Sequence, residues 1–120
     1  MGRRTDLDER LLDYGARIIK VVECLPKTIA GRRMGDQLLR SGTSVGANYE
    51  EAQGAESRAD FVHKLQIALK ELRESNYWLR LLARAGVLST ARLTGIIDES
   101  TQLRVILSKS VVTAKAKGRI

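Results

Sequence analysis

The sequence is poor in the residues that cross-link a chain, bind metals or break helices. Its 120 residues include one cysteine, one histidine and one proline, and aromatic residues make up only 4%. One cysteine excludes an internal disulfide and a cysteine-cluster zinc site, and no second histidine is present to complete a metal site. Few aromatic residues and a single proline favour helices over sheets, since strands enrich aromatic residues and sheet proteins need many turns.

The sequence also predicts no targeting segment and no membrane-spanning segment. The first ten residues, MGRRTDLDER, have no apolar stretch of the kind that signal peptides contain. No uncharged run approaches the roughly 18 residues that a membrane-spanning helix needs. Together with the single cysteine, this predicts a cytoplasmic protein that has no membrane partner. The length fits a single domain over residues 1–120.

Start and stop signals, together with a helical period, divide the chain into four segments. The signals are two capping boxes, a proline and a glycine: Thr5 with Asp8, Ser57 with Asp60, Pro26 and Gly86. Apolar residues recur at the three- and four-residue steps that line one face of a helix. The predicted helices span approximately residues 5–25, 28–54, 58–85 and 90–117. Short connections make successive helices antiparallel neighbours, so we predict an all-α, antiparallel up-down-up-down four-helix bundle.

The segment from residue 28 to 54 is the least helix-like by composition, because it contains five glycines that each cost a helix about 1 kcal/mol relative to alanine. Its run GTSVGAN resembles a phosphate-binding loop, but it has one residue too few between the glycines and no lysine. The order of residue types favours a helix, since apolar, small and polar residues fall on three separate faces. The apolar face holds Met34, Leu38, Val45, Tyr49 and Ala52, and the glycine face holds Gly35, Gly42 and Gly46. We interpret the glycines as room for the close approach of a neighbouring helix.

The third face, which we call the polar strip, carries residue types that are common in active sites: Gln37, Arg40, Ser44, Asn48 and Glu51. Arg40 and Glu51 lie about three turns apart, so they cannot contact each other directly along the helix. Either Ser44 and Asn48 bridge them, or both charges meet a neighbour. We interpret Arg40, Ser44, Asn48 and Glu51 as a structural polar network that sets helix register or subunit contacts. The alternative is a catalytic site, which requires a pocket that opens onto these side chains.

The chain is strongly basic, with 21 Lys and Arg against 14 Asp and Glu and a formal net charge of +7. One face of the third predicted helix, about 140° around from its apolar face, carries four of these cations and a tyrosine. This cationic stripe consists of Lys70, Arg73, Tyr77, Arg80 and Arg84. It is either a nucleic-acid-binding surface or a solvated face whose charges pair with Glu71 and Glu74. A looser set of cations follows near the C-terminus: Lys109, Lys115, Lys117 and Arg119.

Three apolar residues of the third predicted helix lie about 100° or more from its core face: Ile67, Trp78 and Leu81. One helix cannot bury both groups in the same four-helix core, so we predict that these residues form an oligomer interface. The alternative is a widened core within one protomer. Of the remaining reactive side chains, we assign His63 to the surface or an interface, and Cys24 to a buried apolar position.

Residues 38–82, from LLRSGTSVGANYEEA to SNYWLRLL, resemble the signature region of a bacterial four-helix-bundle family. Members of this family include proteins encoded by intervening sequences in 23S ribosomal RNA genes. The resemblance rests on two clusters: Arg40, Ser41, Ser44, Val45, Gly46, Ala47, Asn48 and Glu51, then Phe61, Lys64, Leu65, Ala68, Lys70, Glu71, Glu74, Tyr77, Trp78 and Leu79. It implies a homopentameric ring, similar to the accessory variability determinant protein of diversity-generating retroelements, which binds nucleic acid and a reverse transcriptase. It implies no catalytic activity.

Charge, helix faces and resemblance lead to one principal hypothesis and one alternative. We predict a non-enzymatic oligomer of helical bundles that binds RNA or DNA through repeated basic surfaces, as an accessory factor that needs no cofactor or metal. The alternative is a protein–protein adaptor ring whose charge serves only solubility. Contacts to phosphate give weak sequence preference and a steep dependence on salt, which distinguishes the first hypothesis from the second.

Overall fold

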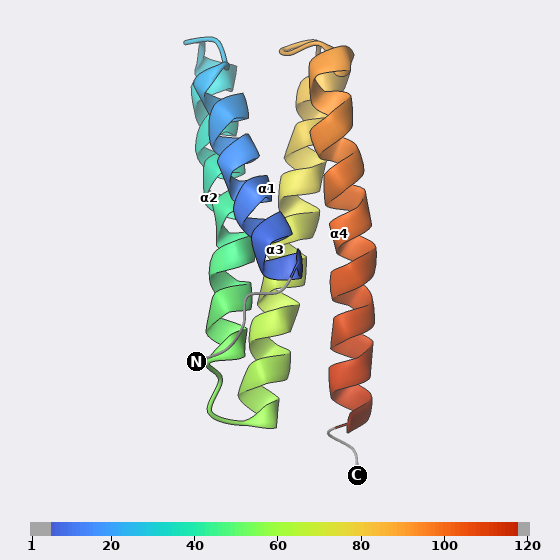
Figure 1. Ribbon diagram of the computed structural model, residues 1–120. Helices are drawn as coiled ribbons and strands as arrows, with labels where there is room; N and C mark the ends of the chain where they lie inside the picture. The colour runs from blue at the N-terminus through green and yellow to red at the C-terminus, as the bar shows by residue number, and fades with distance from the viewer. Residues whose placement is uncertain (1–5, 118–120) are drawn as a thin grey trace.

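The protein is a rod of four long helices joined by short turns, 51 × 24 × 23 Å in extent (Figure 1). The structure, a computed structural model, describes residues 6–117. The helices are α1 (Asp6–Glu23), α2 (Ile29–Gln53), α3 (Arg58–Arg84) and α4 (Thr90–Lys117). Each lies within two residues of its predicted bounds, so the prediction of an all-α four-helix bundle is confirmed. The start signal at Thr5 lies outside the described residues.

Side-chain and backbone caps set the helix ends. The Thr28 hydroxyl accepts a hydrogen bond from the Gly31 amide at 3.0 Å, and the Ser57 hydroxyl accepts one from the Asp60 amide at 3.0 Å. Each bond satisfies an amide that the first turn of a helix otherwise leaves unpaired. After α3, Gly86 has a φ of 70°, the left-handed conformation that favours glycine directly after a helix. The caps predicted at Ser57 and Gly86 are confirmed.

The glycine face of α2 packs against α1. A Cβ added at Gly42 would lie 2.7 Å from two carbons of Ile18, and one added at Gly35 would lie 3.2 Å from Leu25. At Gly46 the nearest atom is the Leu11 carbonyl oxygen, 3.5 Å away. The glycines therefore bring α1 and α2 close together, as the interpretation of this face predicts, and the segment from Ile29 to Gln53 is a helix rather than a loop.

Replacing Gly42 by alanine is expected to destabilise the protein by up to about 2 kcal/mol. Overpacking against the buried, β-branched Ile18 costs about 1 to 3 kcal/mol, whereas the loss of a helical glycine returns about 1 kcal/mol. Gly46→Ala is the matched control, and we expect it to stabilise the protein by up to about 1 kcal/mol. Urea denaturation followed by circular dichroism measures both changes. Equal effects of the two substitutions would contradict the tight contact at Gly42.

The four helices are not packed evenly around the bundle. α2 packs along α1 and α3, and α3 packs along α4, but α1 and α4 touch at few places. One of these places is an ion pair, in which Arg10 Nη2 lies 2.7 Å from Glu99 Oε1. The hydrogen bond from Arg10 lowers the pKa of the Glu99 carboxyl below its ordinary value. This ion pair is therefore one of the few contacts between α1 and α4.

Buried hydroxyl and amide groups connect three of the helices inside the core. The Tyr14 hydroxyl lies 2.8 Å from the Ser75 hydroxyl, and Asn76 Nδ2 donates a hydrogen bond to the Ser100 hydroxyl at 2.6 Å. All four residues are buried. Burial raises the pKa of the Tyr14 phenol to about 12, because the phenolate would lose its hydration. These pairs tie α1 to α3 and α3 to α4, and they restrict how the helices can slide.

Cys24 corrects one prediction. The side chain is exposed, not buried, because α1 ends at Glu23 and Cys24 lies in the turn that follows, beyond the packed part of the helix. Its sulfur lies 3.2 Å from Arg92 Nη2, at the start of α4. Cys24 is therefore a surface residue of the α1–α2 turn.

Candidate nucleic-acid interface

The cationic stripe forms an exposed face on the C-terminal half of α3. All five of its side chains are exposed: Lys70, Arg73, Tyr77, Arg80 and Arg84. The opposite face of the same helix supplies the buried Leu72, Leu79 and Leu82. Because these leucines fix the rotation of α3 in the bundle, they also fix the direction in which the cations point.

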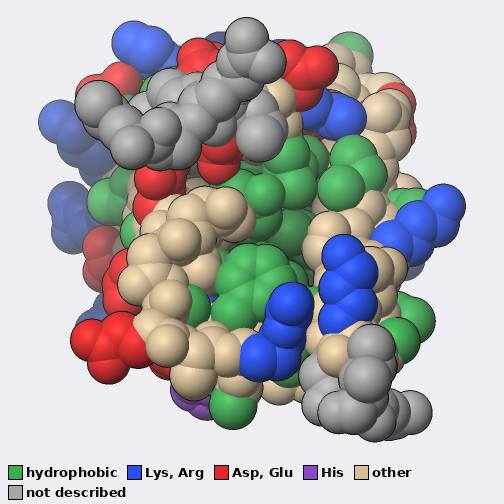
Figure 2. Space-filling model, turned by 60° about the horizontal axis from the view of Figure 1, so that its bottom comes forward, with side chains coloured by type: hydrophobic (Ala, Val, Ile, Leu, Met, Phe, Trp, Pro, Cys, Tyr) green, Lys and Arg blue, Asp and Glu red, His purple; other side chains and the backbone are tan. Residues whose placement is uncertain are grey.

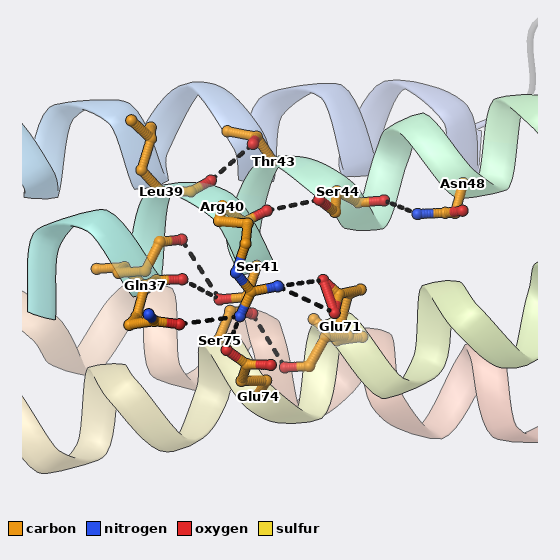
Figure 3. A network of polar contacts seen from close by, with 12 residues as sticks. Gln37, Leu39, Arg40, Ser41, Thr43, Ser44, Asn48, Glu71, Glu74 and Ser75 are labelled. Carbon is orange, nitrogen blue, oxygen red and sulfur yellow. Dashed lines mark hydrogen bonds and ion pairs between the residues drawn. The ribbon is translucent and has the colours of Figure 1, made fainter.

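The two carboxylates nearest to the stripe in sequence pair with another helix. Arg40 of α2 donates to the Glu71 carboxylate at 3.0 Å and also forms an ion pair with Glu74 (Figure 3). The Glu74 carboxylate additionally accepts a hydrogen bond from Trp78 Nε1 at 3.0 Å. A third contact, from Arg40 to the Gln37 side-chain oxygen at 3.1 Å, holds the guanidinium over the α2–α3 seam. Both carboxylates therefore contribute to the contact between α2 and α3.

This pairing means that Glu71 and Glu74 do not neutralise the cationic stripe. Within residues 6–117, no ion pair joins a carboxylate to Lys70, Arg73, Arg80 or Arg84. The interpretation that the stripe is neutralised by Glu71 and Glu74 is therefore wrong, because both acids meet Arg40 instead. Four exposed positive charges on one helix face attract anions.

Asn76 positions two arginines at the edge of the stripe. Its side chain is buried, and its Oδ1 accepts hydrogen bonds from Arg80 Nε at 2.9 Å and from Arg104 Nη1 at 3.3 Å. Arg104 belongs to α4, so the structure adds a cation that the inspection of α3 alone missed. The only sequence signal for Arg104 is its place beside the buried Leu103 on α4, which puts it next to the α3–α4 seam.

Tyr77 presents an aromatic ring among these cations. The side chain is 50% exposed, and its ring meets the Trp78 ring edge to face at a centroid distance of 5.4 Å. The Arg80 guanidinium lies 5.9 Å from the centroid of the Tyr77 ring. With Leu81 and Arg84, these two residues line a small cleft of about 170 Å³. The cleft combines an aromatic edge with positive charge.

Charged residues of the polar strip pair with α3, and the strip residues do not form a continuous series of side-chain hydrogen bonds along α2. The Ser44 hydroxyl donates to the Arg40 carbonyl at 2.6 Å, and Asn48 Nδ2 donates to the Ser44 carbonyl at 2.9 Å, so both bond to their own helix (Figure 3). Glu51 pairs with Lys64 of α3 at 3.1 Å. Of the two alternatives for Arg40 and Glu51, the second holds, since each charge meets the neighbouring helix and no bridge forms between them.

The predicted interface residues Ile67, Trp78 and Leu81 are all half-buried. Trp78 packs against the main core, so for this residue the widened core is observed. The physical reason is that α3 has a neighbour on each flank, α2 and α4, and therefore buries a wider arc than a helix with one neighbour. More exposed apolar side chains lie elsewhere, for example Leu12 on α1 and Val112 on α4.

The structure separates the remaining candidates from the cationic stripe. Lys109, Lys115 and Lys117 lie at the C-terminal end of α4, beside the start of α3, and the stripe occupies the other half of α3. Arg119 lies outside the described residues. His63 is exposed near Lys115, and residues 6–117 contain no group of acidic, histidine or cysteine side chains placed to hold a metal ion. Over the same residues, no helix is both long and apolar enough to cross a bilayer.

The fold and the unpaired cations define a small, basic four-helix-bundle protein with one positively charged helix face. Residues 7–109 match the family of the 23S rRNA-intervening sequence protein, and the chain belongs to this family. The chain is also similar to a crystal structure from Bacteroides thetaiotaomicron, a protein of unknown function from the S23 ribosomal protein family. The two are 37% identical, with a TM-score of 0.78, over 88% of this chain and 97% of the other. A comparison with curated proteins gives no match.

The family match confirms the resemblance that residues 38–82 carry and extends it over α1 and most of α4. Part of the signature has a structural explanation, since Arg40, Glu71 and Glu74 form the ion pairs between α2 and α3. Gly46, which also belongs to the signature, lies at the α1–α2 contact. These residues of the signature therefore contribute to the packing of the helices.

Proposed function

We propose that this protein is a non-enzymatic, cytoplasmic accessory factor that binds RNA or DNA through the cationic stripe of α3. The observation that carries the proposal is the pairing of Glu71 and Glu74 with Arg40, which leaves the stripe without a carboxylate partner within residues 6–117. A cation in an ion pair must break that pair before it can bind a phosphate. A cation without a carboxylate partner can bind a phosphate directly. The polyanionic partner therefore meets four available charges per protomer.

The arrangement of the stripe favours contacts to the backbone of a nucleic acid over contacts to its bases. Lysine and arginine side chains on one straight helix face follow phosphates, and they carry no base-specific pattern by themselves. Tyr77 is the exception, because a half-exposed ring next to Arg80 offers a surface for one unpaired base. We therefore propose weak sequence preference, with some preference for single strands over duplexes.

Exposed apolar residues on unlike faces support an oligomeric assembly. On α1, Leu12 is 59% and Ile19 is 43% exposed, and on α4, Val105 is 52% and Val112 is 67% exposed. Contacts between unlike faces of successive copies form a ring when the rotation between the copies closes. A ring repeats the stripe in every copy, which raises the avidity for a long polyanion. The family resemblance supports five copies, and we propose a homopentamer.

The salt dependence of binding tests the proposal. If the four cations of one protomer contact phosphates, the logarithm of the association constant should fall with the logarithm of the salt concentration with a slope of about −3 for a single strand. Fluorescence anisotropy of labelled RNA and DNA oligonucleotides, titrated with the purified protein at several salt concentrations, measures this slope. Absent binding, or binding that does not change with salt, would overturn the proposal.

A protein adaptor is the second candidate, and the exposed apolar residues on α1 and α4 favour it. In this case the positive charge would serve solubility, and the ring would hold another protein. Affinity capture from a lysate, with and without nuclease treatment, separates the two functions. A protein contact survives the nuclease, whereas a partner bridged by RNA is lost.

A further inference from the structure

Within residues 6–117, the bundle has four helices over only part of its length, because α1 is much shorter than the other helices. It has 18 residues, against 27 in α3 and 28 in α4, which makes it about 13 to 15 Å shorter than these two helices. The short turn at Pro26 joins the C-terminus of α1 to the start of α2, so the missing length falls at the opposite end. Figure 1 shows α1 beginning about midway along the bundle, beside α2, α3 and α4 that continue past it.

In the described part of the chain, only α2, α3 and α4 surround the core at this end. A separate buried cluster fills it: Ala52 of α2, Leu65 of α3, and Val111 and Ala114 of α4. None of these residues, nor the half-buried residues packed against them, comes from α1. Among residues 6–117, no helix covers the side of this cluster that α1 would cover in a full-length bundle.

A groove of about 480 Å³ lies along this open side. Its apolar lining comes from all three helices and includes Phe61, Leu65, Ile106 and Ala114. Among residues 6–117, the charged residues that line it are positive: Arg58 on α3, and Lys109 and Lys117 on α4. Figure 2, which looks onto this end, shows apolar side chains in a hollow with Lys and Arg side chains beside it. An occupant that complements this groove is apolar on one side and acidic on its flanks.

The groove is long enough to hold about three turns of a helix. Between Ile106 and Lys117 it follows α4 for about 17 Å, or three helical turns, and it lies where further turns of α1 would run. It offers little for base stacking, since Phe61 is half-buried and the Arg58 guanidinium lies over its ring at 5.7 Å. The chain's own end segments, MGRRT and GRI, carry only positive side-chain charge, as the rim does. A helix from a partner protein fits these constraints.

We propose that this groove binds an acidic amphipathic helix of a partner protein, which completes the four-helix bundle at this end. The partner helix presents about three turns, with apolar residues at steps of three and four on the groove side. Glutamate or aspartate on one flank pairs with Arg58, and on the other flank with Lys109 and Lys117. This inference is independent of nucleic-acid binding, because the cationic stripe lies on the other half of α3.

A labelled peptide tests the inference on the full-length protein. The probe is a helix-forming peptide of about four turns, with a leucine stripe flanked by glutamates on both sides, and the control peptide replaces every glutamate by lysine. We expect the glutamate peptide to bind and to gain helicity, and the lysine peptide to bind at least about tenfold more weakly. Isothermal titration and circular dichroism measure the two effects. Equal binding of both peptides, or no binding of the glutamate peptide, overturns the proposal.

Charge reversal on the rim locates the site. Lys109→Glu with Lys117→Glu should weaken binding of the glutamate peptide at least about tenfold, because both exposed side chains then repel it. Lys20→Glu with Lys27→Glu is the matched control: both lysines are exposed at the other end of the molecule, and the net charge changes equally. Equal losses in both variants would mean that charge alone drives binding, and they overturn the assignment.

Two further results identify other occupants and likewise overturn the proposal. If a second copy covers the groove, Lys109→Glu with Lys117→Glu changes the oligomeric state in light scattering, and the wild-type oligomer does not bind the peptide. If the groove is a nucleic-acid site, an unlabelled oligonucleotide displaces the peptide, and the same variant loses oligonucleotide binding. Loss of nucleic-acid binding through variants of the α3 stripe leaves peptide binding unchanged, so failure of one proposal is distinguishable from failure of the other.

Discussion

A variant with Arg73→Glu and Arg80→Glu is expected to bind RNA and DNA at least about a hundredfold more weakly than the wild type. The change removes two of the four unpaired cations of each protomer and puts two negative charges beside the remaining two, Lys70 and Arg84. Each lost phosphate contact lowers the affinity, and each new carboxylate repels the same backbone. In an oligomer the loss is repeated in every copy, which lowers the avidity further. The salt slope measured by fluorescence anisotropy should fall by about half.

Arg32→Glu with Arg33→Glu is the matched control for this variant. Both arginines are exposed near the N-terminus of α2, where a glutamate interacts favourably with the helix dipole. The net charge changes by the same amount as in the stripe variant, so any general effect of charge is equal in both. Binding within about threefold of wild type in the control, together with loss in the stripe variant, assigns the contact to α3. Equal weakening would assign it to the net charge of the protein.

The packing of α1 against α2 could be predicted from the sequence because the residues that cause it are near in sequence and regular in spacing. Gly35 and Gly42 lie two turns apart on one face of α2, and only close contact with another helix makes glycine favourable at buried helical positions. Ser57 sets the start of α3 through a hydrogen bond from the nearby Asp60 amide, and Gly86 sets its end through its own positive φ angle. Such local causes are visible in a sequence without knowledge of the tertiary contacts.

The partners of charged residues could not be predicted in the same way. Glu71 and Glu74 directly follow Lys70 and Arg73 in the sequence, but consecutive residues point about 100° apart on a helix, so these pairs do not face each other. Arg40, more than thirty residues earlier, meets both acids because α2 packs beside α3. The ion pairs depend on the rotation of two helices about their axes. A single sequence contains no direct measure of that rotation.

The exposure of Cys24 and the partial burial of Trp78 have a related cause. Cysteine is usually buried, but the side chain of Cys24 follows the end of α1 and no neighbouring helix covers it. A periodic pattern assigns one buried face to each helix, whereas α3 is flanked by α2 and α4 and buries part of the Trp78 side chain as well. The shortness of α1 within the described residues, by contrast, could be predicted from the lengths of the segments. The predicted first helix is shorter than the third and fourth, and Pro26 places the difference away from the α1–α2 turn.

Asn76→Ala is expected to destabilise the protein by about 2 to 3 kcal/mol, the largest stability change that we predict. Asn76 is buried and bonds to Ser100, Arg80 and Arg104, so alanine removes three hydrogen bonds and leaves a small cavity. Alanine is also the better helix former, which returns a fraction of a kcal/mol. Asn48→Ala is the control, because it makes the same gain in helix propensity. It removes one hydrogen bond, which Asn48 donates to the Ser44 carbonyl of its own helix.

The two asparagine variants separate the role of Asn76 in stability from its role in binding. Urea denaturation should place Asn48→Ala within about 0.5 kcal/mol of the wild type and Asn76→Ala well below it. At a temperature where both variants are folded, Asn76→Ala should also bind nucleic acid a few-fold more weakly, since Arg80 and Arg104 lose the oxygen that orients them. A loss of stability without any change in affinity would show that Asn76 contributes to folding and not to nucleic-acid binding. Equal stabilities of the two variants would show that the buried hydrogen bonds between α3 and α4 add little to folding.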